Sequence, residues 1–218
     1  MPILSTSKLY RDFKDIDKDA YHTIIRFYEA KQMAISRLPF DVYFDMLVDY
    51  TSALFEVGAY TKHITTVDKV IQLSIAHNIQ FYNGVDIYFK SLYQKAAAHY
   101  NCLEHDAAIH ILKELVKIAP YHNLSILFLK RCLYRSQPKY IKIARATSIA
   151  LFLGAAIITA IEVMIIHPFS PTYANLFEQF RLLTLGFGIF VLLGTFLYHR
   201  YYINYQVGQF VKEVRKGK

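Results

Sequence analysis

The residues whose types could support chemistry are nine histidines, two cysteines and three closely spaced aspartates near the N-terminus. His99 and Cys102 could form a weak metal or thiol pair, although such residues more often lie on the surface or in the core of helices. Asp15, Asp17 and Asp19 alternate as in a calcium loop, but the glycine and the bidentate glutamate that such a loop requires are missing. We therefore predict no metal site.

Motifs for catalysis or cofactor binding are equally absent from the sequence. It contains no phosphate-binding G-x-x-x-x-G-K-[ST] loop, no G-x-G-x-x-G, no H-E-x-x-H and no G-x-S-x-G. His105 and His110 are five residues apart, which is not the spacing that places two ligands on one helical face. We expect no catalytic residue and no cofactor, so the chain is not predicted to be an enzyme.

One carboxylate, Glu162, lies inside a long apolar segment, four residues before its end. A carboxylate at that depth of a membrane is costly unless it is neutral, paired or close to water. It could be a proton or ion site, or a contact with a polar partner subunit. Alternatively, the side chain reaches the outer interface or bonds to Tyr173 or Arg181, and this second interpretation is the one we favour.

Two apolar segments predict membrane-spanning helices in the C-terminal third of the chain. Hydrophobic residues make up 54% of the sequence and charged residues only 19%, whereas a soluble domain carries about 25% charge. Residues 146–166 contain no Lys, Arg or Asp, and 182–198 contain no charge. The second span extends to about residue 203 if His199 and Arg200 reach back to the interface. The first segment has 21 residues and the uncharged part of the second has 17, close to the roughly 20 residues of helix that cross a bilayer.

Prolines and basic residues predict how these spans are arranged. Pro168 and Pro171 separate them, so we expect a helical hairpin with both chain ends on one side. Basic residues flank both spans on that side: Lys139, Lys142, Arg145, Arg200, Lys212, Arg215, Lys216 and Lys218. The positive-inside rule then places both termini in the cytoplasm. We expect an integral, two-span protein of the inner or plasma membrane, in contact with membrane lipid.

The distribution of charge argues against nucleic-acid binding, although the net charge is +8. Residues 1–138 contain 16 Lys and Arg against 14 Asp and Glu, whereas residues 139–218 contain 9 against 3. The basic excess therefore lies beside the apolar spans, where the orientation rule explains it. Binding to DNA or RNA requires a basic face on a folded domain, so we expect no nucleic-acid partner.

Helical spacing of apolar residues predicts an all-α domain over residues 1–138. Six helices are expected at about 17–36, 41–57, 61–77, 86–101, 104–118 and 124–135, the first capped by Asp17 or Asp19. Asn83 and Gly84 form a turn signal. The sequence also repeats itself at an offset of 45 residues, since D-V-Y-F-x-x-L at 41–47 returns as D-I-Y-F-x-x-L at 86–92.

The second copy of this repeat resembles a tetratricopeptide repeat. Small residues, a large apolar residue and a terminating proline lie at the spacing of that family, as Ala96, Ala108, Leu112 and Pro120. The first copy differs, because Thr51 and Lys62 or His63 stand where small residues are expected. The resemblance covers about residues 40–120 and implies a helical-hairpin repeat (α-solenoid) fold for the cytoplasmic domain predicted over residues 1–138. This domain precedes the transmembrane hairpin of residues 139–203.

Residues 204–218 are expected to form a cytoplasmic amphipathic helical tail. One apolar stripe follows helical spacing in this region, formed by Ile203, Val207, Phe210, Val211 and Val214. No glycine or proline lies between Gly194 and Gly208 to bend the chain. The second span should therefore continue without interruption to about residue 214.

Aromatic side chains on the first helix of each repeated pair are the candidate partner-binding residues. In helical repeats this helix faces the concave surface where a partner segment can bind. The candidates are Tyr43, Phe44, Tyr88, Phe89 and Tyr93, with packing between helix pairs as the alternative. The sequence thus predicts a membrane-anchored scaffold that binds a protein partner or assembles a homo- or hetero-oligomeric membrane complex. The alternative is a small integral subunit of a transport or secretion assembly that uses Glu162 to move ions or protons.

Overall fold

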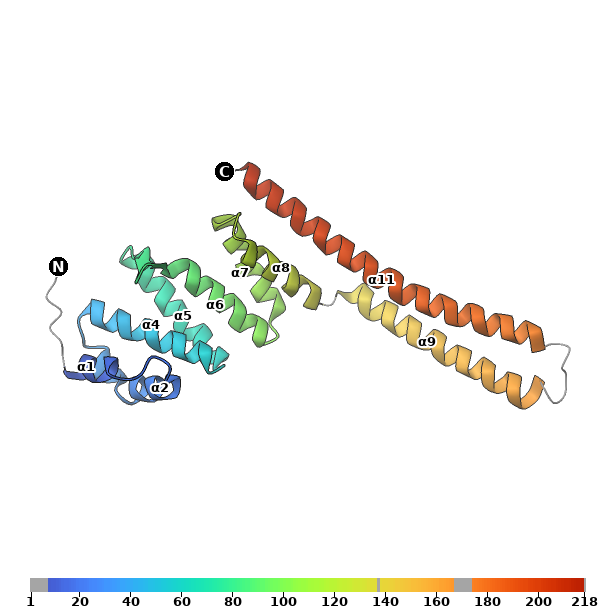
Figure 1. The fold of residues 1–218 in the computed structure, drawn as a ribbon, viewed down its shortest axis with the longest axis horizontal. Helices are drawn as coiled ribbons and strands as arrows, with labels where there is room; N and C mark the ends of the chain where they lie inside the picture. The colour runs from blue at the N-terminus through green and yellow to red at the C-terminus, as the bar shows by residue number, and fades with distance from the viewer. Residues whose placement is uncertain (1–7, 137, 167–173, 218) are drawn as a thin grey trace. The chain divides into compact units, whose positions relative to one another are not determined.

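The computed structural model describes residues 8–136, 138–166 and 174–217, and the chain divides into two compact units, Met1–Cys132 and Leu133–Lys218. The N-terminal unit is a succession of short helices, whereas the C-terminal unit is a pair of long helices (Figure 1). The described residues are therefore mainly helical, with two long apolar helices, as predicted. Two strands of two residues each are the exception, because the sequence predicts no strand.

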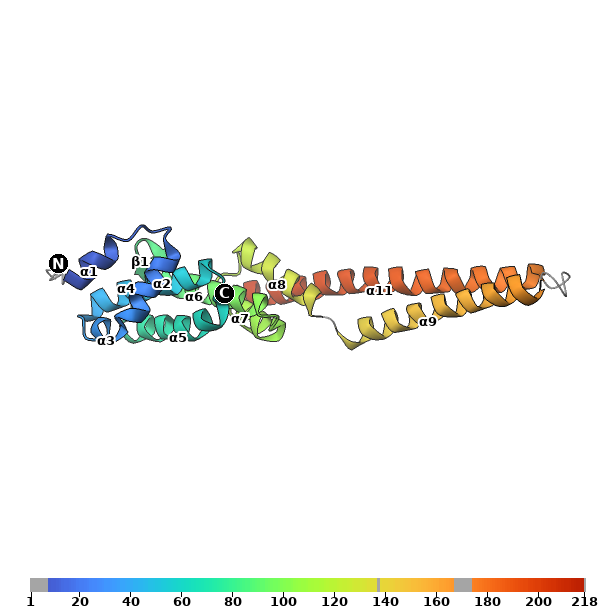
Figure 2. The same ribbon diagram turned by 90° about the horizontal axis from the view of Figure 1, so that it is seen from below.

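The N-terminal unit contains eight helices and one short hairpin among its described residues. They are α1 (Lys8–Lys14), α2 (Tyr21–Ala30), α3 (Gln32–Ile35), α4 (Phe40–Glu56), α5 (Tyr60–Ala76), β1 (Phe81–Tyr82), β2 (Val85–Asp86), α6 (Ile87–Asn101), α7 (His105–Ile118) and α8 (Asn123–Arg135), whose last three residues belong to the second unit. Helices α2, α4, α5, α6 and α7 pack successively, each against the next (Figure 2).

Local sequence explains most of the helix boundaries. Gly58 (φ 77°) follows α4, and Asn83 (φ 49°) with Gly84 (φ 76°) forms the tight turn between β1 and β2. The Asp86 carboxylate caps α6 by accepting a hydrogen bond from the Phe89 amide at 2.8 Å.

The start of the chain differs from the sequence-based expectation. Helix α2 begins after Ala20 without any side-chain cap, so the predicted cap by Asp17 or Asp19 is wrong. Instead, Asp17 accepts a hydrogen bond from the Asp19 amide, which stabilises the turn before the helix. Helix α1 was not predicted. It is attached to α4 through Asp45, which pairs with Lys14 at 2.6 Å and accepts a hydrogen bond from Tyr10 at 2.8 Å.

The helix pairs α4–α5 and α6–α7 bury equivalent positions at the predicted offset of 45. Ala53 and Ala98 are buried, as are Val67 and Leu112. Ala96 and Ala108 are also fully buried in the α6–α7 pair, where small side chains let two helices approach closely.

The equivalent positions in the α4–α5 pair are Thr51 and His63, and both are buried too. His63 Nδ1 lies 2.9 Å from the Thr51 carbonyl oxygen, close enough for the imidazole to donate a hydrogen bond to it. The first pair thus joins its helices by a buried hydrogen bond where the second pair has only alanines.

The C-terminal unit consists of α9 (Lys139–Ile161), a π-helical turn η1 (Glu162–Ile166) and α11 (Ala174–Lys216), which lie side by side (Figures 1 and 2). The predicted turn around Pro168 and Pro171 falls outside the described residues. Helix α11 is continuous over 43 residues, so the second apolar segment and the tail form one helix, as the sequence predicts.

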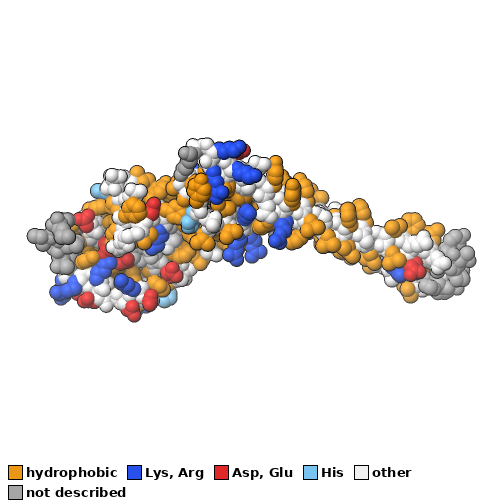
Figure 3. All heavy atoms as spheres, turned by 45° about the horizontal axis from the view of Figure 1, so that its top comes forward, with side chains coloured by type: hydrophobic (Ala, Val, Ile, Leu, Met, Phe, Trp, Pro, Cys, Tyr) orange, Lys and Arg blue, Asp and Glu red, His pale blue; other side chains and the backbone are white. Residues whose placement is uncertain are grey.

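Both long helices are long and apolar enough to cross a membrane. Only 11% and 6% of their most apolar stretches are buried within the structure. On the face drawn in Figure 3, hydrophobic side chains cover the hairpin along most of its length.

The contact between the two long helices follows a seven-residue period. The buried side chains of α9 and η1 are Ile141, Ser148, Ala155 and Glu162. Gly188 faces them from α11, where an added Cβ atom would lie only 2.8 Å from the Phe152 ring. A seven-residue period is typical of two helices that wind around each other with a left-handed twist.

Only some of the small residues in the two spans contribute to this interface. Ala155 and Gly188 are buried, whereas Gly154, Gly186 and Gly194 have no neighbour within 4 Å of an added Cβ atom. Close approach of the helices therefore depends on a few small residues, among them Ala155 and Gly188, rather than on every small residue of the two helices.

Candidate functional site

The two aromatic candidates on α4 have different environments. Phe44 is 2% exposed and packs against Phe40 and Tyr82 in the core of the N-terminal unit. It therefore offers no surface to a partner, and the packing alternative is correct for this residue. Tyr43 is half-buried, and it lies near Tyr28, whose pKa is raised mainly by burial and further by Tyr43.

The three candidates on α6 lie closer to the surface, and all are half-buried. The ring of Phe89 meets the His122 ring edge-on at 4.9 Å, and the Tyr93 ring lies 5.7 Å from that of Phe128 on α8. Phe89 and Tyr93 therefore already have partners within the N-terminal unit. Of the two, Tyr93 also borders a groove.

This groove lies between α6 and α8 and has a volume of about 450 Å³. Its wall includes Tyr93, Tyr100, Leu124, Leu127, Phe128 and Arg131. Leu124 and Leu127 are 61% and 60% exposed and lie on one face of α8 beside the aromatic rings of the groove, so together they form a continuous apolar patch. We call it the α6–α8 groove.

The groove combines an apolar floor with one positive charge. The Arg131 guanidinium lies 6.0 Å from the centre of the Tyr100 ring, at the distance of a cation–π contact. No carboxylate is among the described residues that line it. The geometry suits an apolar segment that carries a neighbouring acidic group.

Sequence reasoning found only Tyr93 of these groove residues. The missed signal is that α8 has two apolar faces. Ser125, Leu129 and Cys132 form the buried face, whereas Leu124 and Leu127 form a second face that no described residue of the N-terminal unit buries. A helix that packs on one side only should show a single apolar stripe.

The carboxylate inside the first apolar segment is paired. Glu162 is 5% exposed, and its Oε2 accepts a hydrogen bond from Arg181 Nη1 at 2.9 Å across the hairpin. Arg181 also lies 3.8 Å from Glu178. The pairing with Arg181 is one of the alternatives favoured from the sequence; Tyr173, the other suggested partner, lies outside the described residues. An ion pair lowers the cost of placing either charge in an apolar environment.

The histidines and cysteines among the described residues do not converge on one site. His99 Nδ1 lies 2.6 Å from Glu104 rather than facing Cys102. Cys132 is fully buried, and burial raises the pKa of its thiol to about 12, which makes it unreactive. Within residues 8–136, 138–166 and 174–217, no three His, Cys, Asp or Glu side chains are placed to hold a metal ion.

Comparison of the chain with protein-family models, curated proteins and solved structures finds no match.

Proposed function

We propose that this chain is a membrane-anchored helical scaffold whose hairpin spans the bilayer and whose N-terminal unit binds a protein partner. The observation that carries the proposal is the pair of long apolar helices, whose most apolar stretches are almost entirely exposed. Hydrocarbon is the environment in which such a surface is stable. The basic residues before α9 and after the second span favour an orientation with both termini in the cytoplasm.

The N-terminal unit supports the binding part of this proposal. Its helices stack in sequence, and the α4–α5 and α6–α7 pairs bury equivalent positions, as repeats of the tetratricopeptide type do. The α6–α8 groove supplies an exposed apolar surface bounded by Arg131. We assign the groove to a partner segment with two apolar anchors and an adjacent carboxylate.

The Glu162–Arg181 pair favours a scaffold over an ion-conducting subunit. Its two charges compensate each other across the hairpin, and the Glu162 side chain is 6% exposed. A group that carries ions or protons must exchange them with water, whereas this pair has the geometry of an interhelical clamp.

Photocrosslinking in the native membrane tests the groove. A photoreactive amino acid replaces Leu127 in the full chain, and the matched control replaces Ile75, which is 63% exposed on α5. We expect one discrete adduct from position 127, no such adduct from position 75, and loss of the adduct when Arg131→Glu is added. Equal adducts at both positions, or an adduct at 127 that Arg131→Glu does not affect, would contradict the assignment.

A further inference from the structure

A second cavity lies within the C-terminal unit, between α9 and α11, and has a volume of about 530 Å³. Its floor is apolar and includes Ile141, Leu193 and Phe196, whereas its polar side includes Tyr134, Arg145 and Arg200. A cavity of this size accommodates a small molecule or part of a lipid.

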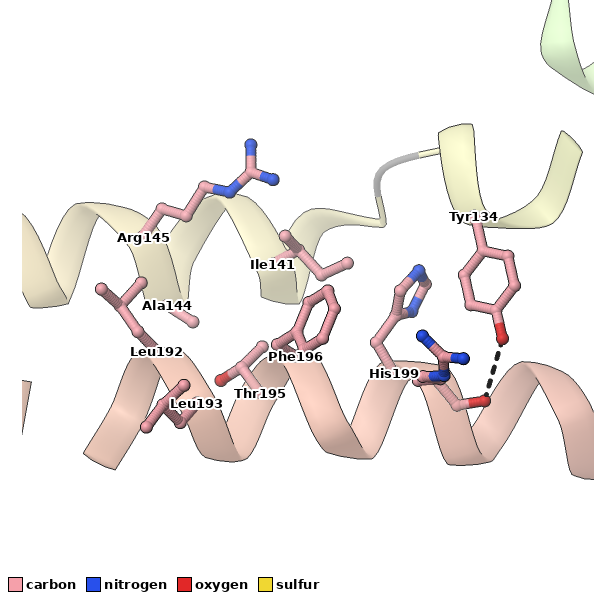
Figure 4. A pocket seen from close by; sticks show the side chains of 10 residues that line it. Tyr134, Ile141, Ala144, Arg145, Leu192, Leu193, Thr195, Phe196 and His199 are labelled. Atoms are coloured by element: carbon pink, nitrogen blue, oxygen red, sulfur yellow. Dashed lines mark hydrogen bonds between the residues drawn. The ribbon is translucent and has the colours of Figure 1, made fainter. Parts of the chain in front are cut away.

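Most of the polar groups lie at one end of this cavity. Figure 4 shows His199 and Tyr134 at that end and Leu192 and Leu193 at the other, where the Arg145 side chain extends from α9 at the rim. Such a gradient matches a molecule that has a hydrocarbon chain and a polar head.

The two arginines lie near the same end of the hairpin but not in the same turn. Tyr140 is level with His199, so the backbone of Arg145 lies about five residues deeper in the predicted spans than that of Arg200. Side chains on a helix lean toward its N-terminus, so Arg145 leans toward the side of the two termini and Arg200 leans toward the spans. The two guanidinium groups can therefore approach one another near the predicted interface.

Local hydrogen bonds hold the polar end in place. The Tyr140 hydroxyl lies 2.7 Å from His199 Nδ1, and the Tyr134 hydroxyl donates to the Arg200 carbonyl oxygen at 3.3 Å. These contacts fix the turn of α11 that carries Arg200, so less ordering is required when a ligand binds.

The charge of the cavity selects an anion. No acidic side chain is among the described residues that line it, and residues 139–218 contain 9 Lys and Arg against 3 Asp and Glu. Two of those three carboxylates, Glu162 and Glu178, lie beside Arg181 near the other end of the hairpin. Basic pockets between membrane helices on the cytoplasmic side are suited to anionic lipid headgroups.

We propose that this cavity binds one anionic phospholipid, whose phosphate lies between Arg145 and Arg200 and whose upper acyl chain lies on Leu193 and Phe196. The inference rests on the proposed insertion of the hairpin into the membrane. It adds a defined lipid site to that function, and this site would fix the depth of the hairpin end next to the helical unit.

The test reconstitutes the full chain into vesicles of phosphatidylcholine with one-fifth phosphatidylglycerol. Lipids that co-purify after mild detergent extraction are then counted by native mass spectrometry. The Arg145→Gln/Arg200→Gln variant removes the proposed headgroup contacts. The matched control, Lys212→Gln/Lys216→Gln, removes the same charge from the tail. A third variant, Ala144→Phe, keeps both arginines and narrows the cavity.

We expect the wild type and the lysine control to retain phosphatidylglycerol in preference to phosphatidylcholine. Each lost arginine should weaken this preference about fivefold, and Ala144→Phe should weaken it as well. If the arginine and lysine variants lose the preference for phosphatidylglycerol equally, the attraction is diffuse and the site is overturned. An arginine variant that keeps the full preference would also overturn it. Displacement of the lipid by millimolar inorganic phosphate would also overturn it.

Failure of the proposed membrane insertion would give a different result from failure of the lipid site. If the wild-type chain does not float with the vesicles at all, the membrane insertion itself is wrong and the lipid site falls with it. If the chain floats and resists alkaline extraction but shows no lipid preference, only the lipid site is overturned.

Discussion

At the scale of single residues, two buried polar side chains, His63 and Glu162, lie at helix–helix contacts where the equivalent positions are apolar or small. His63 occupies a position where the second helix pair has an alanine, and it bonds to the Thr51 carbonyl oxygen. Glu162 occupies the seven-residue stripe of α9 and η1 where the other buried positions are apolar or small. Each group is tolerated because it has a partner within its own unit.

His63 should make the stability of the N-terminal unit sensitive to acid. Burial lowers the pKa of its imidazole below the usual value of 6.5, so the folded protein holds it neutral at pH values where the unfolded chain takes up a proton. Stability should therefore fall as the pH drops below about 6.5, because the unfolded state binds more protons there.

Thermal unfolding of the full chain in detergent between pH 7.5 and 5 measures this effect. We expect the unfolding temperature of His63→Asn, which cannot titrate at this position, to fall less steeply with decreasing pH than that of the wild type. His22→Asn, which changes an exposed histidine, should follow the wild type. Identical slopes for the wild type and His63→Asn would show that the buried imidazole is not a source of the sensitivity.

Removal of one charge from the Glu162–Arg181 pair should weaken the hairpin. Glu162→Gln leaves Arg181 next to Glu178 only, at 3.8 Å, and should cost about 1–3 kcal/mol, less than a fully buried pair because Arg181 is partly exposed. The exchanged variant, Glu162→Arg with Arg181→Glu, should recover most of that loss. Unfolding in detergent measures both changes, and a Glu162→Gln variant as stable as the wild type contradicts the clamp.

At the scale of elements, the hairpin is governed by close approach at a few small residues. Gly188 is buried opposite the Phe152 ring, whereas Gly186 has no neighbour within 4 Å of an added Cβ atom. The two glycines are two residues apart on the same helix and differ only in what they face, so they form a matched pair for mutation.

Gly188→Leu should separate the two long helices. The new side chain collides with Phe152 and should destabilise the hairpin by about 1–3 kcal/mol, and Phe152→Ala should partly relieve the strain. Gly186→Leu, which points away from the interface, should have little effect. Spin-label distances between α9 and α11 report the separation, and equal distances in the two leucine variants would refute this assignment of the interface.

Sequence patterns predicted the longer helices well but not the elements that depend on distant contacts. Helices α4 to α8 lie close to their predicted ranges because apolar periodicity and the signals at Gly58, Asn83 and Asp86 are local. Helix α1 was missed because the contacts that attach it, Lys14 and Tyr10 with Asp45, join residues 31 and 35 positions apart.

The candidate site was harder to predict than the fold. Phe44 and Tyr93 are both aromatic residues on first helices, yet one is in the core and the other borders a groove. The difference arises from tertiary packing, because Phe40 and Tyr82 cover Phe44, whereas Tyr93 lies at the open groove between α6 and α8. An aromatic stripe shows that a face is covered, but not whether another helix or a partner covers it.

At the scale of the whole molecule, the proposed function combines a membrane hairpin and a helical binding unit in one chain. In this proposal, hydrocarbon covers the long helices and a partner segment covers the α6–α8 groove. The central claim is that the hairpin crosses the bilayer twice, so that the loop between the spans and the N-terminal unit lie on opposite sides of the membrane.

Cysteine labelling in intact cells is the most direct measurement of this claim. In a Cys102→Ser/Cys132→Ala background, the loop carries a single reporter as Ser170→Cys, and the N-terminus carries one as Ser7→Cys. An impermeant maleimide added outside should label position 170 in intact cells, and should label position 7 only after the membrane is opened. Labelling of position 7 but not 170 in intact cells would reverse the orientation. Equal protection of both positions until the membrane is opened would contradict the two-span hairpin.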